Sequence, residues 1–321
     1  MAAAARLPDA TVRLPVHAGD GPEFESTGNQ PSSIGFDAAA PGRLAAPDRP
    51  FIPLPAMTGS PSRPFANRIV LITGASAGIG EACARAFARE GARLVLAARR
   101  RERLEALTPS LLELGAPEVI SHTLDVRDRG AVIDWIAQLA ASGHIPDVLV
   151  NNAGLSRGLS PLHEGEFRDW DEMIDTNVKG LLHVTRVLLP HMIEQGRGHV
   201  INLGSTAGHI VYPGGNVYNA TKFAVRALTE ALNLDLVGTP IRVSSVDPGL
   251  VETEFSIVRF RGDEERARRV YEGLEALTAA DIAEIVRYVA SAPPHVNIVQ
   301  TVVYPTAQRS PWLIAREPEH P

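Results

Sequence analysis

The sequence predicts an α/β fold built on a doubly wound parallel sheet of about seven strands in a single domain. Three observations support this prediction. Short apolar runs recur along the chain from residue 69 onward, and segments that fit helices separate them. A glycine-rich turn joins the first run to the first helix. Polar or glycine residues directly follow most of the runs, so they would gather at one edge of a parallel sheet.

The first 65 residues differ from the rest of the chain. They hold 11 of the 25 prolines and 6 of the 27 glycines, without apolar periodicity. Such a segment cannot bury enough apolar surface to offset the entropy lost on ordering, so we expect a disordered tail. Met57 lies shortly before the first strand, and the tail could instead reflect the choice of start codon. We expect the domain itself at residues 66–310, followed by a C-terminal tail at residues 311–321.

The apolar runs predict the strands in order. Ile69–Thr73 suits a strand that helices bury on both faces. Further strands are predicted at residues 93–98, 119–125, 148–152, 199–204, 242–246 and 298–304. The helices between them are predicted at residues 80–90, 101–114, 131–141 and 170–194, after Gly215, and at 279–290. Pro190 should bend or end the long fourth helix. This alternation implies right-handed crossovers between parallel strands.

The composition excludes several classes of protein. A net charge of −6 with scattered arginines gives no basic surface for nucleic acid. The single cysteine, Cys83, excludes an intramolecular disulfide and a cysteine-based metal site, and its place on an apolar helix stripe favours core packing. The sequence shows neither an apolar run of membrane-spanning length nor a signal-peptide pattern. We therefore expect a cytoplasmic protein without a metal, membrane or nucleic-acid partner.

The glycine-rich turn predicts a dinucleotide-binding site. Glycine lets the backbone approach a pyrophosphate, which the free N–H groups and the dipole of a helix N-terminus can bind. Glycine in a tight turn can also serve conformation alone, but here the turn follows a strand and opens a helix. The residues expected to contact the cofactor in this turn are Gly74, Ala75, Ser76, Ala77, Gly78, Ile79 and Gly80.

Arginines at the end of the second strand predict NADP as the cofactor. A site selective for NAD commonly places an acidic residue there to bind the ribose 2′-hydroxyl. The chain instead has Arg99, Arg100 and Arg101, and guanidinium groups pair well with a 2′-phosphate. The alternative is that these arginines only solvate a helix start, where positive charge is mildly unfavourable.

Tyr218 and Lys222 predict the reaction centre. Four residues apart on a helix, they lie on one face, and a positive charge beside a phenol lowers its pKa toward the range useful for proton transfer. The alternative is a solvated helix face. However, only two of the 31 basic residues are lysines, so a lysine here indicates a position that needs a compact ammonium group.

Together these motifs resemble the short-chain dehydrogenase/reductase family, whose fold is of the Rossmann type. Thr73–Gly80 looks like the family's Thr-Gly-x-x-x-Gly-x-Gly turn, and Asn151–Gly154 like its Asn-Asn-Ala-Gly motif. Four residues match the family's catalytic Asn, Ser, Tyr and Lys: Asn177, Ser205, Tyr218 and Lys222. The resemblance covers about residues 66–305 and implies NADP-dependent oxidation or reduction.

The resemblance also implies a role for each residue. Tyr218 would exchange a proton with the substrate oxygen, and Ser205 would hold that oxygen. Lys222 would lower the Tyr218 pKa and bind the nicotinamide ribose, while Asn177 would position a relay water. Asp125 would contact adenine, with a helix cap as the alternative. Further cofactor contacts are implied for Tyr218, Lys222, Val126, Asn152, Ala153, Gly154, Pro248, Gly249, Val251 and Thr253.

Within the family, the chain is most similar to NADP-dependent 3-hydroxy acid dehydrogenases, above all through Phe255–Asp263. This similarity implies a small-molecule substrate such as L-allo-threonine, L-serine, 3-hydroxyisobutyrate or malonic semialdehyde. Ser205 and Tyr218 would hold its oxygen, and Arg259 is the expected partner of its carboxylate. Arg261 could equally be a solvated loop residue, and His209 and Tyr212 either line the pocket or pack.

Two other functions remain open at this point. The same mechanism could reduce 3-oxoacyl thioesters or other ketones, although an arginine near the substrate favours a small acid. A non-catalytic NADPH-sensing protein is the alternative of another class, and the complete set of catalytic residues opposes it. The resemblance further implies a homodimer or homotetramer, with the helix of Tyr218 and the preceding long helix at the interface.

Overall fold

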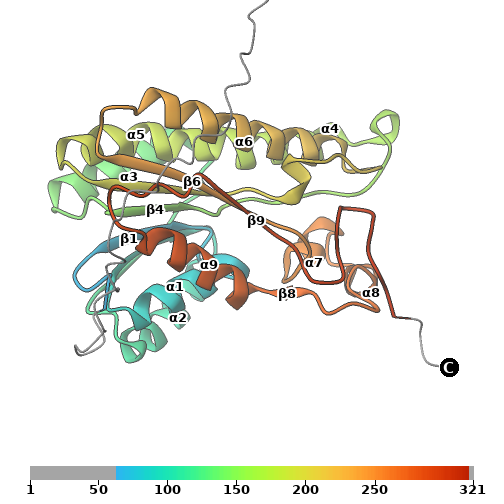
Figure 1. Ribbon diagram of the computed structural model, residues 1–321, viewed down its shortest axis with the longest axis horizontal. Helices are drawn as coiled ribbons and strands as arrows, with labels where there is room; N and C mark the ends of the chain where they lie inside the picture. Colours follow the sequence, from blue (N-terminus) through green and yellow to red (C-terminus); the bar gives the residue numbers. More distant parts are fainter. Residues whose placement is uncertain (1–62, 318–321) are drawn as a thin grey trace, which may run out of the picture. The chain divides into compact units, whose positions relative to one another are not determined.

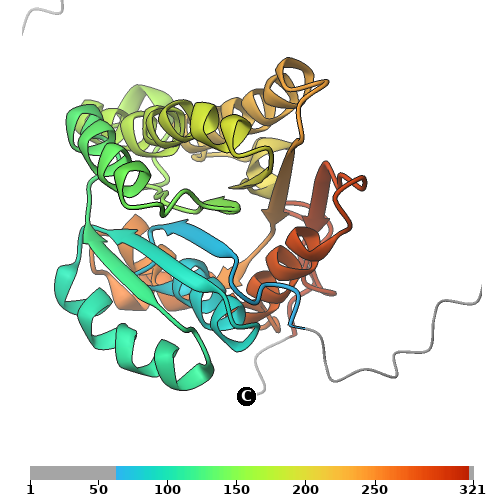
Figure 2. The same ribbon diagram turned by 90° about the vertical axis from the view of Figure 1, so that its left-hand side faces the viewer.

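A seven-stranded sheet forms the centre of the computed structural model, which describes residues 63–317 (Figures 1 and 2). Its strand order is β3-β2-β1-β4-β5-β6-β9, and every neighbouring pair is parallel. The strands are β1 (Ile69–Thr73), β2 (Arg93–Ala98), β3 (Val119–Thr123), β4 (Val148–Asn151), β5 (Gly198–Leu203), β6 (Ile241–Pro248) and β9 (Gln300–Val303). The predicted doubly wound parallel sheet is confirmed. The tail expected at residues 1–65 lies outside the described residues except for its last three, and there the expectation of disorder is wrong for Phe65, which is buried against Phe87 in the core.

Helices cover both faces of this sheet (Figure 1). One face carries α1 (Gly78–Arg89), α2 (Arg101–Leu114) and α9 (Ala279–Ser291). The other carries α3 (Arg129–Ala141), α4 (Phe167–Ile174), α5 (Leu181–Glu194) and α6 (Asn216–Asp235). Two sets of buried apolar side chains fill the two layers, and alternate residues of β1 belong to different sets: Val70 and Ile72 to one, Ile69 and Leu71 to the other.

A smaller group of elements follows β6. β7 (Val251–Glu252) pairs in parallel with β8 (Leu277–Thr278), and α7 (Phe255–Arg259) and α8 (Glu264–Arg269) lie between them in the chain. These elements are orange in Figure 1, to the right of α9. They extend beyond the carboxyl end of β6, where α/β sheets bind their ligands.

The long helix predicted at residues 170–194 is interrupted. A π-helical turn, Asp175–Gly180, separates α4 from α5 and contains Asn177. Such turns often occur at functional positions. Pro190 does not end the helix: α5 continues to Glu194, and the side chain of Met192 in its last turn is fully buried.

A buried histidine in β5 links stability to pH. His199 is 1% exposed, its Nε2 lies 2.7 Å from Ser244 Oγ, and its Nδ1 has no partner among residues 63–317. Burial, assisted by the charge of Arg242, lowers the pKa of His199 from 6.5 to about 3. The folded protein therefore holds this histidine neutral.

Between pH 7 and pH 5, we expect His199 to reduce the free energy of unfolding by about 2 kcal/mol. Because the folded pKa is the lower one, the unfolded chain takes up the proton first; the stabilisation is complete above the unfolded pKa and is lost as pH falls toward 3. Urea unfolding of wild type and His199→Gln at both pH values measures this effect. Glutamine does not titrate, so equal pH dependence in the two proteins would contradict the assignment.

Candidate active site

A cavity of about 540 Å³ lies where the strands end, a volume typical of small-molecule sites. Most of the predicted site residues line it: Gly74, Ser76, Ala77, Gly78, Ile79, Arg99, Arg100, Asp125, Val126, Asn152, Ala153, Gly154, Ser205, Tyr218, Lys222, Pro248, Gly249, Val251, Thr253 and Arg259. Ala75, Gly80 and Asn177 do not line it, and the first of these is fully buried. The structure thus brings residues from six strand ends to one cavity.

The turn after β1 has a backbone conformation that requires glycine. Gly74 and Gly78 have φ angles of +67° and +55°. A Cβ at Gly80 would lie 2.4 Å from the Gly74 carbonyl oxygen, so Gly80 serves the packing of the turn. The N-cap residue of α1, Ala77, offers no side-chain cap to the first N–H groups of the helix. An uncapped helix N-terminus at a cavity wall fits a pyrophosphate.

Asn152 and Thr73 hold this turn in place. The Asn152 Nδ2 donates to the carbonyl oxygens of Thr73 and Gly74, at 2.9 and 3.2 Å. The Thr73 Oγ1 accepts hydrogen bonds from the backbone N–H groups of Asn152 and Ala153, at 3.1 and 3.0 Å. These bonds join the carboxyl ends of β1 and β4, the point at which the strand order changes direction.

One of the predicted phosphate-binding arginines, Arg100, contacts an acidic residue from a distant part of the chain. The Arg100 Nε donates to Ser76 Oγ at 3.1 Å, and its Nη1 donates to Glu254 Oε2 at 2.9 Å. Arg103 donates to the other carboxylate oxygen at 2.6 Å. Hydrogen bonds from Arg103 and then Arg100 lower the pKa of Glu254. The sequence does not indicate this role of Glu254, because 154 positions separate it from Arg100.

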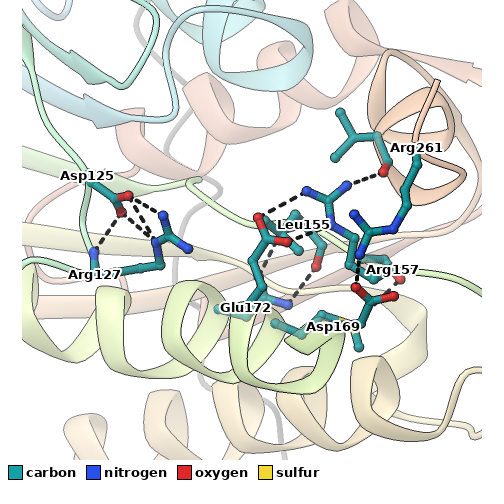
Figure 3. A network of polar contacts seen from close by, with 11 residues as sticks. Asp125, Arg127, Leu155, Arg157, Asp169, Glu172 and Arg261 are labelled. Carbon is teal, nitrogen blue, oxygen red and sulfur yellow. Dashed lines mark hydrogen bonds and ion pairs between the residues drawn. The ribbon is translucent and has the colours of Figure 1, made fainter. Parts of the chain in front are cut away.

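Asp125 is paired with Arg127 (Figure 3). Burial acts to raise the pKa of Asp125, but the Arg127 hydrogen bonds outweigh it and hold that pKa below its ordinary value. Helix α3 is capped by Asp128, whose Oδ1 accepts from Ala131 N at 3.0 Å. The alternative that Asp125 caps a helix is therefore wrong.

Three of the four catalytic side chains predicted from the sequence line the cavity: Ser205, Tyr218 and Lys222. Ser205 directly follows β5, and its Oγ lies 3.4 Å from the Pro248 carbonyl oxygen. Tyr218 and Lys222 lie one turn apart on α6 and are 7% and 8% exposed. The Lys222 Nζ donates to the Leu203 carbonyl oxygen at 2.8 Å and lies 6.0 Å from the Tyr218 ring centroid.

The pKa of Tyr218 does not follow the expectation that Lys222 lowers it. Burial raises the pKa of Tyr218 above 10, while the Arg259 guanidinium and the Ser205 hydroxyl oppose this change. Burial also lowers the pKa of Lys222 to about 8, against the charge of Asp247. The physical reason is position: the ammonium group is directed at a backbone carbonyl, whereas the Arg259 guanidinium lies over the phenol ring at 5.2 Å.

Asn177 lies behind the cavity wall. Its Oδ1 accepts from Leu155 N, and its Nδ2 donates to Leu155 O, both at 2.8 Å, and to Thr221 Oγ1 at 3.0 Å. A Cβ at Gly154 would lie 3.3 Å from Asn177 Oδ1 and 3.9 Å from Lys222 Nζ. Glycine at this position thus leaves space between the two side chains, and the role of Asn177 in a water relay stays a prediction.

The segment after β6 passes beside the glycine turn. A Cβ at Gly78 would lie 3.4 Å from Thr253 Cβ. Gly249 N donates to Val303 O at 2.7 Å, and Thr253 Oγ1 accepts from Phe255 N at 3.2 Å, where α7 begins. This segment therefore connects the glycine-rich turn after β1 to α7.

Arg259, at the end of α7, lies over the predicted reaction centre. Its guanidinium carbon is 5.2 Å from the ring centroids of both Tyr218 and Phe255, and its Nη2 donates to Tyr212 Oη at 3.1 Å. Its Nε is buried and has no hydrogen-bond partner within residues 63–317. A guanidinium that lines the cavity beside a phenol suits an anionic substrate group.

The structure also shows which of Arg261, His209 and Tyr212 line the cavity. Arg261 pairs with Asp169 on α4 (Figure 3) and does not line the cavity. His209 does not line it either, because its Nε2 lies 2.7 Å from Asp247 Oδ2. Tyr212 does line the cavity.

The last described residues contribute to the cavity as well. Pro311, Ile314 and Arg316 line it, although they lie beyond the predicted end of the domain at residue 310. Ala315 N donates to Ala307 O at 2.8 Å, which turns this segment back on itself. The segment has no apolar periodicity that would have indicated a structural role.

Between residues 63 and 317, no cluster of His, Cys, Asp or Glu is arranged to hold a metal ion. Within the same range, none of the helices has the length and apolar character needed to cross a membrane. Cys83 is buried, and burial raises the pKa of its thiol to about 12, so it packs rather than reacts.

Known proteins are similar to this chain in sequence. The family model described as short chain dehydrogenase matches residues 68–263. The NADP-dependent 3-hydroxy acid dehydrogenase YdfG of Salmonella typhi is 51% identical over 241 residues, which cover 75% of this chain and 96% of that protein. Sulfoacetaldehyde reductase 2 of Chromohalobacter salexigens is 46% identical over 243 residues, covering 75% of this chain and 95% of that protein.

A solved structure agrees in fold as well as in sequence. The closed form of serine dehydrogenase complexed with NADP⁺ is similar with a TM-score of 0.73 and 45% identity. The similarity covers 78% of this chain and all of that one.

Proposed function

The chain belongs to the short-chain dehydrogenase family, and we propose that it interconverts a small 3-hydroxy acid and its 3-oxo form with NADP(H). The observation that carries this proposal is the Arg259 guanidinium, which lines the cavity and lies over the Tyr218 ring, 5.2 Å from its centroid. A cationic group at this position favours an anionic substrate, and a neutral substrate would leave its charge unmatched. The names of its relatives, a 3-hydroxy acid dehydrogenase and a serine dehydrogenase, support the same reading.

The residues of the cavity fit NADP in this proposal, and they come from the predicted domain at residues 66–310 together with Pro311, Ile314 and Arg316. The uncapped start of α1 would hold the pyrophosphate, and Arg99 and Arg100 would hold the 2′-phosphate. Asp125 and Val126 would lie against adenine. The nicotinamide end would be held by Asn152, Ala153, Gly154, Tyr218, Lys222, Pro248, Gly249, Val251 and Thr253. When bound, NADP supplies or accepts the hydride.

Proton transfer is assigned to Tyr218. The phenol would take the proton of the substrate hydroxyl in oxidation and return it in reduction. Because burial raises its pKa, the phenol is protonated at neutral pH, which is the state that reduction needs. Ser205 would hold the substrate oxygen, Lys222 would bind the ribose, and Asn177 would position a relay water.

The site favours small substrates that carry an anionic group. L-allo-threonine, L-serine, 3-hydroxyisobutyrate and malonic semialdehyde share a carboxylate within two carbons of the reacting centre. Sulfoacetaldehyde, named in one relative, carries a sulfonate at similar reach. Arg259 can pair with either anion.

A steady-state assay tests the proposal. With NADP⁺, kcat/KM for 3-hydroxyisobutyrate should exceed that for its uncharged methyl ester on the order of 10- to 100-fold, the effect of one charge-assisted hydrogen bond. NADP⁺ should be preferred over NAD⁺. Faster reduction of an acetoacetyl thioester than of malonic semialdehyde would favour a thioester reductase instead. If no substrate in the panel is turned over while NADPH still binds, the sensing function is the better assignment.

We also propose a cytoplasmic homodimer or homotetramer. Large apolar side chains are exposed on α5 and α6: Leu182 (39%), Ile193 (40%), Phe223 (37%) and Leu234 (75%). These are the helices that the family resemblance places at an interface, and association would cover these side chains. Sedimentation velocity measures the oligomeric state directly, and a monomer at micromolar concentration would contradict the proposed dimer or tetramer.

A further inference from the structure

Arg157 lies in the loop after β4 and makes contacts that the proposed reaction does not use. Its Nε and Nη2 donate to the two carboxylate oxygens of Glu172 on α4, at 2.8 and 3.0 Å (Figure 3). Its Nη1 donates to the carbonyl oxygen of Val258 in α7. The Arg157 and Glu172 side chains are only 14% and 16% exposed, and neither residue lines the cavity.

The bidentate contact between Arg157 and Glu172 favours the ionised form of the Glu172 carboxyl group. Two parallel bonds between a guanidinium and a carboxylate are among the stronger polar contacts in proteins. The Arg157 hydrogen bonds lower the pKa of Glu172 more than burial raises it. Glu172 therefore fixes the orientation of the guanidinium and leaves its third nitrogen directed at Val258.

Both ends of the loop segment Leu155–Gly158, here called the Arg157 loop, are hydrogen-bonded to predicted active-site residues. Before it, the backbone N–H and carbonyl oxygen of Leu155 are bonded to the Asn177 side chain, each at 2.8 Å. After it, the backbone N–H of Gly158 donates to the Arg259 carbonyl oxygen at 3.0 Å. The loop thus runs from the π turn of Asn177 to the turn that presents Arg259.

Helix α7 cannot hold that turn by itself. It has only five residues, Phe255–Arg259, and isolated helices of this length are unstable. The direction of the Arg259 side chain consequently depends on what anchors the last two residues of α7. The Arg157 side chain binds the carbonyl oxygen of Val258, and the backbone N–H of Gly158 binds the carbonyl oxygen of Arg259.

We propose that Arg157, oriented by Glu172, is a positioning residue that fixes the Val258–Arg259 turn over Tyr218 and so determines selectivity for anionic substrates. Arg157 contacts neither substrate nor cofactor and acts through Arg259. This inference rests on the proposed function, because selectivity for an acid is what the fixed guanidinium provides.

A double variant provides the test. Loss of Arg157 alone would leave the Glu172 carboxylate buried and uncompensated, so Arg157→Met is combined with Glu172→Met. The KM for 3-hydroxyisobutyrate should rise on the order of 10-fold, consistent with loss of one oriented ionic contact, with kcat nearly unchanged. The KM for its methyl ester should stay close to wild type. Arg157→Lys keeps the positive charge but loses the bidentate guanidinium, and it should fall between wild type and the double variant.

Arg287→Met is the matched control, because it breaks another half-buried ion pair, with Glu90, on the opposite face of the sheet. This variant should have wild-type KM values for both 3-hydroxyisobutyrate and its methyl ester. Equal changes of KM for the acid and the ester in the double variant, or no change in either, would overturn the proposal.

Hydrogen exchange separates this inference from the proposed function. The amides of Phe260 and Gly262 are bonded to α7, at 3.1 and 2.9 Å. In the double variant they should exchange faster than in wild type and in Arg287→Met, whatever the substrate proves to be. Unchanged exchange would reject the anchoring role even if the enzyme oxidises 3-hydroxy acids. Faster exchange in a protein that does not discriminate acid from ester would instead count against the proposed function.

Discussion

Replacement of Tyr218 by Phe is expected to lower kcat by roughly 10³-fold, because the substrate hydroxyl then has no general base. Phenylalanine keeps the ring that packs against Phe255, whose centroid lies 5.7 Å away. The affinity for NADPH, measured by fluorescence titration, should therefore stay close to that of wild type. Steady-state oxidation of 3-hydroxyisobutyrate measures the loss.

Tyr212 offers the matched control. Its phenol lines the same cavity but is bonded to Arg259 rather than aimed at a reacting oxygen. Tyr212→Phe should retain most of kcat. Turnover near the wild-type rate in Tyr218→Phe would refute its role in proton transfer, and an equal loss in both variants would mean that these phenols only shape the cavity.

The second large effect is expected from Arg259→Met. It should raise KM for 3-hydroxyisobutyrate on the order of 10- to 100-fold, because a hydrogen bond to a charged group contributes about 1.5–3 kcal/mol. The methyl ester should lose little affinity. The pH profile of the Arg259→Met enzyme should also move. Arg259 lowers the Tyr218 pKa against the effect of burial, so this pKa should be higher in the variant. Oxidation needs the ionised phenol and should therefore reach its maximum rate at higher pH than in wild type.

Arg261→Met is the control for this variant, since Arg261 pairs with Asp169 outside the cavity. It should behave like wild type toward both compounds. A rise of KM in Arg259→Met that is the same for acid and ester would show that Arg259 supports the cavity wall without binding the carboxylate.

The sheet and most of the cavity could be predicted because their signals are local. An apolar run such as Ile69–Thr73 predicts a strand buried on both faces, and the glycine positions report backbone angles that only glycine tolerates freely. Tyr218 and Lys222 depend on a single helical turn, so their spacing alone places them together.

Features that depend on distant contacts could not be predicted. The sequence favours Arg259 as the carboxylate partner, but Arg261 is only two positions away and chemically identical, so its place relative to the cavity stays open. Only the structure shows that α7 ends at Arg259, while Arg261 adopts a positive φ of 55° and turns toward α4. The π turn around Asn177 is likewise invisible, because the apolar pattern continues through it. The Tyr218 pKa depends on burial and on Arg259, neither of which the Tyr-x-x-x-Lys spacing reveals.

The bridge that Glu254 forms with Arg100 and Arg103 has a consequence for attempts to redesign cofactor preference. An acidic substitution at position 100, the usual device for binding an unphosphorylated ribose, would place two carboxylates at the same point. Their repulsion would act on the start of α7, whose far end carries Arg259. A switch to NAD would therefore need a compensating change at Glu254, or it would disturb substrate recognition at the other end of the helix.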